Sequence, residues 1–559
     1  MKLEQLSAGA LQRPFLTVFA LVTLIATGIH ASLTLPIDAF PDVSAPQVKI
    51  ILKVPGMTPE EMESRVTVPV EVDLLGIPQQ TMLRSTSKYG LSDITLDFAE
   101  GTDIYWARSQ VSERLNGVMA SLPADATGGL APITTPLGEM FMFTVEGPQP
   151  LVERRALLDW VIRPALRTLP GVADVNVLGG LAGAIEVAPD PARLTAAGIS
   201  INSLRTALQA NNSSTGAGRL GAGEEALLVR LQGRLQTLED VANLVVSAQG
   251  GQQIRVRDVA DVRHGSLTRF GGVTHNGKGE TVQGLVLGLR GANAKVVVAE
   301  VKQRLAELAK TLPAGTRIET VYDRSALVNR AVHTVSKALL EAVALVAVLL
   351  VLFLGHVRAA VTVAVVLPLS ALWTFLLMRW TGLSANLMSL GGLAIAIGML
   401  VDAAVVVVEN IVAKLQEEKE TPVGPAKTAL IIAAIREVAV PVGAGIAIIA
   451  LVFLPLLTLE GLEGKLFAPV AMTILFALAG SLLLSLTIIP LLAQWLLKRE
   501  ADEEPWLPRT IAKHYAPLLD RVLARPKPLL IGAGLLLVLS AGVYTQVGKT
   551  FMPTLDEGD

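Results

Sequence analysis

Two carboxylates within one apolar stretch are the residues of this chain best suited to chemistry. Asp402 lies in the run Gly-Met-Leu-Val-Asp-Ala-Ala-Val-Val-Val-Val-Glu-Asn at residues 398–410, which has Glu409 as its only other charged residue. An ionised aspartate at the centre of a bilayer costs about 2.5–3.5 kcal/mol on insertion scales, and such acids usually face a bundle interior and belong to proton or ion pathways. On a helix, Glu409 lies on nearly the same face, about 10 Å further along the axis. Because burial favours the protonated form of a carboxyl group, the pair can form a proton entry path.

A structural interpretation of the same two residues stays open. Asp402 can instead be a hydrogen-bonding group between packed helices, and Glu409 a charge at the membrane surface. The cost of a charge at mid-bilayer favours a functional role for Asp402. It does not separate the two interpretations for Glu409, because the ends of membrane helices tolerate charge.

The stretch around Asp402 is one of seven that are long enough to cross a membrane. A span needs about 20 mostly apolar residues, and only 17% of this 559-residue chain is charged, against about 25% in soluble domains. The run after Arg13 is too long for a signal peptide, and no small-residue cleavage site follows it. The predicted spans are 15–35, 338–354, 359–378, 387–408, 438–457, 469–497 and 529–547.

The lysines and arginines of the short loops predict the orientation of these spans. They are concentrated at the N-terminus and in the loops after the second, fourth and sixth spans, whereas the short loops on the other side hold only Arg379 and Lys465. The N-terminus is therefore expected in the cytoplasm. Residues 36–336 and the last residues, 549–559, are then expected outside.

The long region between the first two spans predicts a folded domain outside the membrane. Strand and helix patterns alternate in it, and Thr58 with Glu61 forms a capping box that opens its first helix. A second pass of the same kind begins near Met140. We therefore predict a polytopic α-helical membrane protein with an α+β domain of split βαβ, ferredoxin-like type. The elements expected in the first pass are strand, helix, strand, strand and helix, at 47–54, 58–74, 81–88, 92–98 and 103–119.

Composition and missing motifs exclude several functions. The chain has no cysteine, which excludes disulfides, thiolate metal sites and cysteine nucleophiles. Its net charge of −2 gives no indication of nucleic-acid binding. An intramembrane aspartyl protease needs a second aspartate on a neighbouring span, and only Asp402 lies deep in one. With no P-loop, G-x-S-x-G or H-E-x-x-H motif, we expect neither an enzyme, a cofactor nor an ATP-driven mechanism.

Several separate motifs resemble the resistance-nodulation-division (RND) efflux transporters, in particular their heavy-metal branch. One begins with Pro-Ile-Asp-Ala-Phe-Pro at residue 36, and another is Val-Asp-Ala-Ala…Glu-Asn around Asp402. The resemblance follows the family order over the whole chain. The remaining motifs are Leu-Pro-Gly-Val-Ala-Asp-Val at 169–175, Gly-Ala-Asn-Ala at 291–294, Tyr-Asp-Arg at 322–324 and Phe-Met-Pro-Thr-Leu-Asp-Glu-Gly-Asp at 551–559.

The resemblance implies a proton antiporter that exports metal cations from the bacterial inner membrane. It implies a homotrimer embedded in membrane lipid, working with a periplasmic adaptor and an outer-membrane channel, and it assigns the proton to Asp402 and a secondary role to Glu409. A docking segment is expected near residues 211–221. The implied domains are the N-terminus with the first span (1–35), a first porter subdomain (36–136), a second porter subdomain with the docking segment (137–336), spans two to six (337–500), a cytoplasmic amphipathic linker (501–528), the seventh span (529–548) and the start of a second periplasmic domain (549–559).

The chain departs from the family pattern at two points. Such pumps have twelve spans in two similar halves, so this chain corresponds to the N-terminal half, and the lysine that partners the relay aspartate belongs to the other half. An exporter of organic amphiphiles and an inert half-pump therefore stay open as alternatives. The additional aspartate of one divalent-metal subgroup is replaced here by Ala396. The Val-Asp-Ala-Ala form is closer to the copper and silver subgroup, although that subgroup has methionine at the position of Leu400.

Methionine thioethers are the candidate ligands for a soft metal. Met140 and Met142 alternate along a predicted strand and so share one face, which makes them the candidate metal-binding pair. Methionine more often fills gaps in a core, and that role stays open for both. The spacing of His264 and His275 indicates no site.

Overall fold

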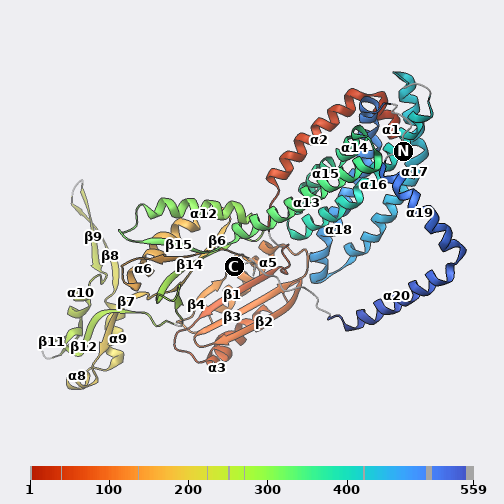
Figure 1. The fold of residues 1–559 in the computed structure, drawn as a ribbon. Helices are drawn as coiled ribbons and strands as arrows, with labels where there is room; N and C mark the ends of the chain where they lie inside the picture. Colours follow the sequence, from red (N-terminus) through yellow and green to blue (C-terminus); the bar gives the residue numbers. More distant parts are fainter. Residues whose placement is uncertain are drawn as a thin grey trace. The chain divides into compact units, whose positions relative to one another are not determined.

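The computed structural model describes residues 3–38, 41–135, 138–222, 225–249, 252–269, 271–418, 422–498 and 506–548 (Figure 1). The chain divides into two compact units. The first unit comprises Met1–Ala131, Asn293–Lys295 and Arg324–Asp559, and the second comprises Pro132–Ala292 and Val296–Asp323.

The first unit contains a four-stranded sheet with helices connecting its strands. The strand order is β2-β3-β1-β4, and the neighbouring strands are antiparallel. The predicted capping box is confirmed, since the Glu61 amide donates to Thr58 Oγ1 at 3.3 Å and the Thr58 amide to Glu61 Oε2 at 3.0 Å. In chain order the elements are β1 (Gln47–Lys53), α3 (Pro59–Met62), the π-helical turn Glu63–Thr67, α4 (Val68–Leu74), β2 (Gln80–Lys88), β3 (Leu91–Phe98), α5 (Ile104–Met119) and β4 (Thr127–Leu130).

Residue periodicity explains how this sheet and its helices pack. Alternate residues of a strand point to one face, whereas residues three or four apart share a helix face. Val48, Ile50 and Leu52 of β1 are accordingly buried, and so are Ala107 and Val111 of α5, all in one apolar cluster. Each element therefore contributes a single apolar side to the same core.

The second unit is built on another antiparallel sheet. Its order is β13-β14-β5-β15, with β6 also paired to β14. The strands are β5 (Glu139–Glu146), β6 (Val172–Gly179), β13 (Val273–Thr274), β14 (Glu280–Gly288) and β15 (Arg317–Asp323). The helical segments between β5 and β6 are α6 (Leu151–Leu157), the π-helical turn Leu158–Ile162 and α7 (Arg163–Arg167). The helix before β15 is α12 (Ala294–Ala309), which belongs to this unit from Val296 onward.

A smaller module is inserted between β6 and β13. It holds the strand pair β7–β12 and the hairpin β8–β9, visible in yellow-green in Figure 1. The expected docking segment at 211–221 covers the two residues before β8 and most of β8, and residues 223–224 lie outside the described residues. The elements are β7 (Gly183–Pro189), α8 (Pro191–Ala196), α9 (Ile201–Ala210), β8 (Ser213–Ala222), β9 (Glu225–Gly233), α10 (Leu238–Asn243), β10 (Val245–Gln249), β11 (Gln252–Arg255), α11 (Val256–Val259) and β12 (Ala260–Ser266).

Seven helical stretches among the described residues are long and apolar enough to cross a membrane, and each overlaps one predicted span. They are Pro14–Thr34 (α2), Arg324–Phe353 in α13 (Arg324–Leu354), Val357–Thr381 with α14 (Val357–Ala364) and α15 (Val366–Thr381), Leu387–Glu417 (α16), Pro425–Thr458 with α17 (Pro425–Phe453), Gly461–Leu496 (α18) and Pro526–Gln546 (α20). Two further helices are α1 (Leu3–Gln12) and α19 (Trp506–Ala524). The expected motif at 551–559 lies outside the described residues.

The helix α17 begins well before the apolar run that predicted it. α17 begins at Pro425 rather than near residue 438, so Lys427 lies in a helix and not in the predicted loop. Its ammonium is buried and donates to the Gln494 carbonyl oxygen at 2.6 Å. The last carbonyl groups of a helix lack partners within the helix. Lys427 therefore caps the C-terminal end of α18, which a hydropathy pattern does not reveal.

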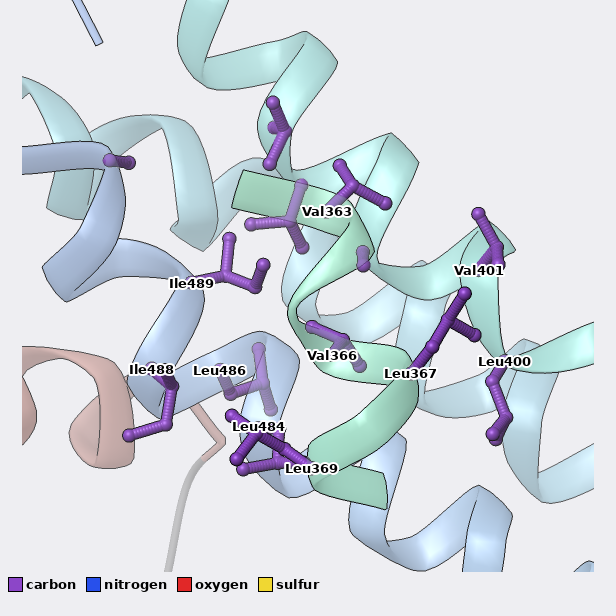
Figure 2. Packing of buried hydrophobic residues seen from close by; sticks show 14 of the residues in the cluster. Val363, Val366, Leu367, Leu369, Leu400, Val401, Leu484, Leu486, Ile488 and Ile489 are labelled. Carbon is purple, nitrogen blue, oxygen red and sulfur yellow. The ribbon is translucent and has the colours of Figure 1, made fainter. Parts of the chain in front are cut away.

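The membrane helices pack around α16 and α18. Figure 2 shows Leu367 of α15 near Leu400 and Val401 of α16, within one buried apolar cluster that also includes residues of α18. Gly392 allows α16 and α18 to approach closely, because a Cβ atom there would lie 2.8 Å from the Val470 carbonyl oxygen. Small residues serve this purpose in membrane helix packing.

A junction of ion-paired and backbone-bonded residues joins three spans. The Arg324 guanidinium at the start of α13 donates to Asp38 Oδ1 from Nε at 3.1 Å and from Nη2 at 2.8 Å. Ile37 forms a parallel bridge with Ala385, and the Ala385 amide donates to the Pro36 carbonyl oxygen at 2.8 Å. These contacts hold together the residues that follow α2, the start of α13 and Ala385, which precedes the N-cap residue of α16.

Replacement of Arg324 by methionine tests how much this junction contributes to stability. We expect Arg324→Met to lower the free energy of unfolding by about 1.5–3 kcal/mol, the range for hydrogen bonds to a charged group. The matched control is Lys337→Met on the same helix, where the pair with Glu341 is exposed and 3.9 Å long. Exposed pairs contribute under about 1 kcal/mol. Equal unfolding midpoints of the two variants in detergent would contradict the expectation.

Candidate functional site

Asp402 lies at the midpoint of α16. The helix begins at a capping box in which the Ser389 amide donates to Asn386 Oδ1 at 2.9 Å and the Asn386 amide to Ser389 Oγ at 2.9 Å. Asp402 is fifteen residues after Leu387 and fifteen before Glu417. At a rise of 1.5 Å per residue it is about 22 Å from either end. A helix of this length that crosses a core about 30 Å thick places its middle deep in hydrocarbon.

Asp402 and Glu409 share one face of α16, as their spacing predicts. Exposed residues recur along this face every three or four positions, namely Ile395, Gly398, Asp402, Val406 and Glu409. The opposite side of the helix is buried against the neighbouring spans. The face that carries both carboxylates is therefore open in the described part of the chain, although intramembrane acids generally face a bundle interior.

Hydrogen bonds on the buried side fix this orientation. Ser481 Oγ of α18 donates to the Leu400 carbonyl oxygen at 2.8 Å, and Asn410 Nδ2 donates to the Ala434 carbonyl oxygen of α17 at 2.7 Å. Rotation of α16 about its axis would break both bonds. Asp402 is consequently held on the open face by contacts made by other residues of its helix.

Neither carboxylate has a hydrogen bond or ion pair with any described residue. The acids nearby are paired instead: Lys414 lies 3.4 Å from Glu417 and 3.4 Å from Glu437. An unpaired acid at this depth is costly when ionised. The geometry therefore suits a carboxyl group that binds and releases a proton, or one that meets a cation from another part of the protein.

The two candidate metal-binding methionines lie in β5, in the second unit. Met140 is buried, and its Sδ and Cε atoms occupy the space left by the missing side chain of Gly288 in β14. Met142 is half-buried and lies opposite Leu285 of β14 and Tyr322 of β15. The position of Met140 agrees with a gap-filling role, and the metal-binding role of the pair stays a prediction.

The structure also gathers a polar cluster that the sequence did not indicate. His275 Nδ1 lies 3.2 Å from Glu146 Oε1 and 3.9 Å from Glu319 Oε2, at a cavity of about 420 Å³. Thr281 Oγ1 donates to Glu146 Oε1 at 2.8 Å, and Arg154 Nη1 lies 3.4 Å from Glu146 Oε2. Burial raises the pKa of Glu146, but these contacts lower it more, so the pKa of this carboxyl lies below its usual value.

The members of this cluster come from distant parts of the chain, so no local pattern marks them. His275 and Glu146 are 129 residues apart in sequence. Among the described residues, no group of three or more His, Cys, Asp or Glu side chains has an arrangement that holds a metal ion. We therefore interpret the contacts of His275 as part of the packing of this sheet edge.

Comparisons with known proteins relate the chain to efflux proteins. The profile of the AcrB/AcrD/AcrF family matches residues 6–559. The chain is 39% identical over 571 residues to the cation efflux system protein CzcA of Alcaligenes sp. (strain CT14), covering 100% of this chain and 53% of that protein. It is 38% identical over 556 residues to the cation efflux system protein CusA of Escherichia coli (strain K12), covering 98% and 53%.

A solved structure agrees with these relatives. The crystal structure of a heavy metal efflux pump, crystal form II, superposes with a TM-score of 0.86 at 34% identity, covering 99% of this chain and 53% of that one. The chain therefore spans about half the length of the curated relatives and solved structure that it matches.

Replacement of Asp402 by leucine separates a structural role from a functional one. Because Asp402 bonds to no described residue, we expect Asp402→Leu to keep or raise the unfolding midpoint of the chain in lipid nanodiscs. Ser481→Ala, which removes a buried bond to the same helix, should lower stability by about 0.6 kcal/mol, the average for hydrogen bonds between membrane helices. A lower midpoint for Asp402→Leu than for Ser481→Ala would assign Asp402 to helix packing.

Proposed function

Since this chain belongs to the AcrB/AcrD/AcrF family of RND efflux transporters, we propose that it carries the proton relay of a pump that exports metal cations across the cell envelope. The observation that carries the proposal is the position of Asp402, unpaired at the midpoint of α16. Its relatives are named as cation efflux proteins, and a heavy metal efflux pump has the same fold. The chain would act as a transporter and not as an enzyme.

The proton would act by changing the charge of the open face of α16. Ionised Asp402 requires a cationic partner, which the family resemblance places in the half beyond this chain. Protonation removes that requirement and favours a different packing of the face. A membrane potential of 100 mV contributes about 2.3 kcal/mol per charge moved, which changes the ratio of two states roughly 50-fold. Glu409, further along the same face, would pass the proton toward the cytoplasmic end.

The junction of Asp38, Arg324 and Ala385 would transmit movement of α16 to the outside domain. The start of α16 is bonded to residues 36–38, and the chain continues from there into β1. A second connection comes from α18, where the Lys465 ammonium donates to the Ser44 carbonyl oxygen at 2.9 Å and lies 2.6 Å from Glu100. Two membrane helices thus contact the segment that leads into the first sheet, which provides a route for alternating access.

The assembly would follow the family pattern. The two α+β sheets, with split βαβ connections, would be periplasmic porter subdomains of a homotrimer in the inner membrane, with the N-terminus in the cytoplasm. The hairpin β8–β9 would be the docking segment, and a periplasmic adaptor and outer-membrane channel would complete the export path. Nearly equal identity to CzcA and CusA does not select a metal.

Neutralisation of Asp402 is the direct test of the relay. We expect Asp402→Asn, made in the native gene, to abolish metal tolerance and proton-coupled cation uptake by everted vesicles, because the side chain can no longer carry a proton. The amount of protein in the membrane should not change. The matched control is Val406→Asn, which places the same amide one turn later on the same face and should retain transport. Normal export by Asp402→Asn would refute the proton-relay assignment.

Conversion of the two methionines to leucine tests the proposed metal ligands. Met-to-Leu changes conserve volume and usually cost under about 1.5 kcal/mol, whereas they remove the soft thioether donor. If Met140 and Met142 bind the substrate, the double variant should lose export of copper and silver ions at least tenfold while zinc export is retained. Met119→Leu, at a partly buried methionine packed against the core of the other sheet, is the control. Equal silver export by the double variant and the control would refute the metal-binding assignment and would indicate that both methionines serve in packing.

A further inference from the structure

A cavity of about 520 Å³ lies where the N-terminal helix meets the membrane helices. Its walls come from α1, α2, α15 and α18. α1 is anchored by Leu11, which is buried in the core of the membrane helices, and the corner between α1 and α2 is held by Thr17 Oγ1, which donates to the Ala10 carbonyl oxygen at 2.9 Å. One side of the cavity therefore belongs to a fixed corner of the fold.

Polar and apolar residues are separated along this cavity. Gln5 and Gln12 line it from α1 and Arg13 from the corner between α1 and α2, whereas the residues that line it along α2 and α18 are mostly apolar, from Leu16 to Leu24 on α2. Leu24 lies eleven residues beyond Arg13, which corresponds to about 16 Å along the helix. One leaflet contributes about 15 Å to the hydrocarbon core. The apolar part thus has the depth of a single leaflet.

The charge at the cavity mouth is positive and unpaired. Arg13 directly precedes the apolar run of α2, and its guanidinium has no hydrogen bond or ion pair with any described residue. No acidic residue lines the cavity. The adjacent Leu16 is 60% exposed, so the cavity is open to the surroundings. Basic pockets between membrane helices bind anionic lipid headgroups, and cavities of about 300–1,000 Å³ with apolar walls and few polar groups are typical ligand sites.

We propose that this cavity binds one anionic phospholipid of the surrounding membrane, with the phosphate at Arg13 and one acyl chain between α2 and α18. The guanidinium supplies a planar fork of donors for phosphate oxygens. Gln5 and Gln12 offer further donors to the headgroup and ester oxygens. The site is separate from Asp402 and does not depend on the proposed transport.

The chain offers closely matched variants for the test. Arg13→Gln removes the positive charge that lines the cavity. Its control is Arg525→Gln, because Arg525 also occupies the N-cap position of a membrane helix that begins with proline but does not line the cavity. Gly9→Leu fills the cavity, since a Cβ atom there meets nothing within 4 Å. Its control is Gly532→Leu, at an equally open glycine of α20.

Lipid binding is measured by native mass spectrometry of the full chain, titrated with phosphatidylglycerol, phosphatidylethanolamine or the free fatty acid of the same acyl length. We expect one tightly held phosphatidylglycerol per chain. Arg13→Gln should weaken its binding about fivefold, the effect of one basic residue near an anionic lipid surface. Gly9→Leu should abolish it, and both controls should retain it with unchanged unfolding midpoints.

Three results would overturn the proposal. Equal binding of phosphatidylethanolamine would remove the role of the headgroup charge. Equal binding of the free fatty acid would assign the cavity to a different ligand. Retention of phosphatidylglycerol by Gly9→Leu at the level of Gly532→Leu would show that the lipid binds elsewhere on the membrane surface.

Discussion

The rotational setting of α16 is the constraint on which the candidate site depends. A carboxylate in the middle of a 31-residue membrane helix is stable only if it is protonated, paired or in contact with water. The helix could avoid this cost by turning Asp402 toward its neighbours, but the bonds from Ser481 and Asn410 hold the other side against α18 and α17. The packing of α16 therefore keeps Asp402 at a position where its carboxylate is poorly solvated. Its protonation state consequently depends on the groups that contact the open face of α16.

Much of the membrane part follows from the sequence because its signals are local. Apolar runs of about 20 residues mark spans regardless of their neighbours, and all seven predicted spans overlap observed helices. The hydropathy pattern did not predict the polar first turns of α17. The ammonium of Lys427 there is hydrogen-bonded to a carbonyl oxygen of α18, which is distant in sequence. The family expected from separate motifs is confirmed by the match over residues 6–559.

Contacts between distant residues were beyond the reach of the sequence pattern. β14 pairs with both β5 and β6, and His275 meets Glu146 across 129 residues, yet each segment alone shows only strand character. The candidate site likewise has one feature that follows from the local sequence and one that depends on distant contacts. The shared face of Asp402 and Glu409 follows from helical periodicity, whereas its openness depends on which helices pack against α16. The ion pair of Asp38 and Arg324 joins two recognised motifs, but their distance in sequence concealed the contact.

Arg13 and Asp402 both lack a partner among the described residues, but they differ in how their solvation can be completed. Arg13 lies at the start of α2, where a long side chain reaches the headgroup region, so a lipid can supply its counter-charge. Asp402 is short and about 22 Å from either end of α16, beyond the reach of a headgroup. Its counter-charge must come from protein or from a proton. Position along a helix thus separates a group that a lipid can satisfy from one that can work in a transport cycle.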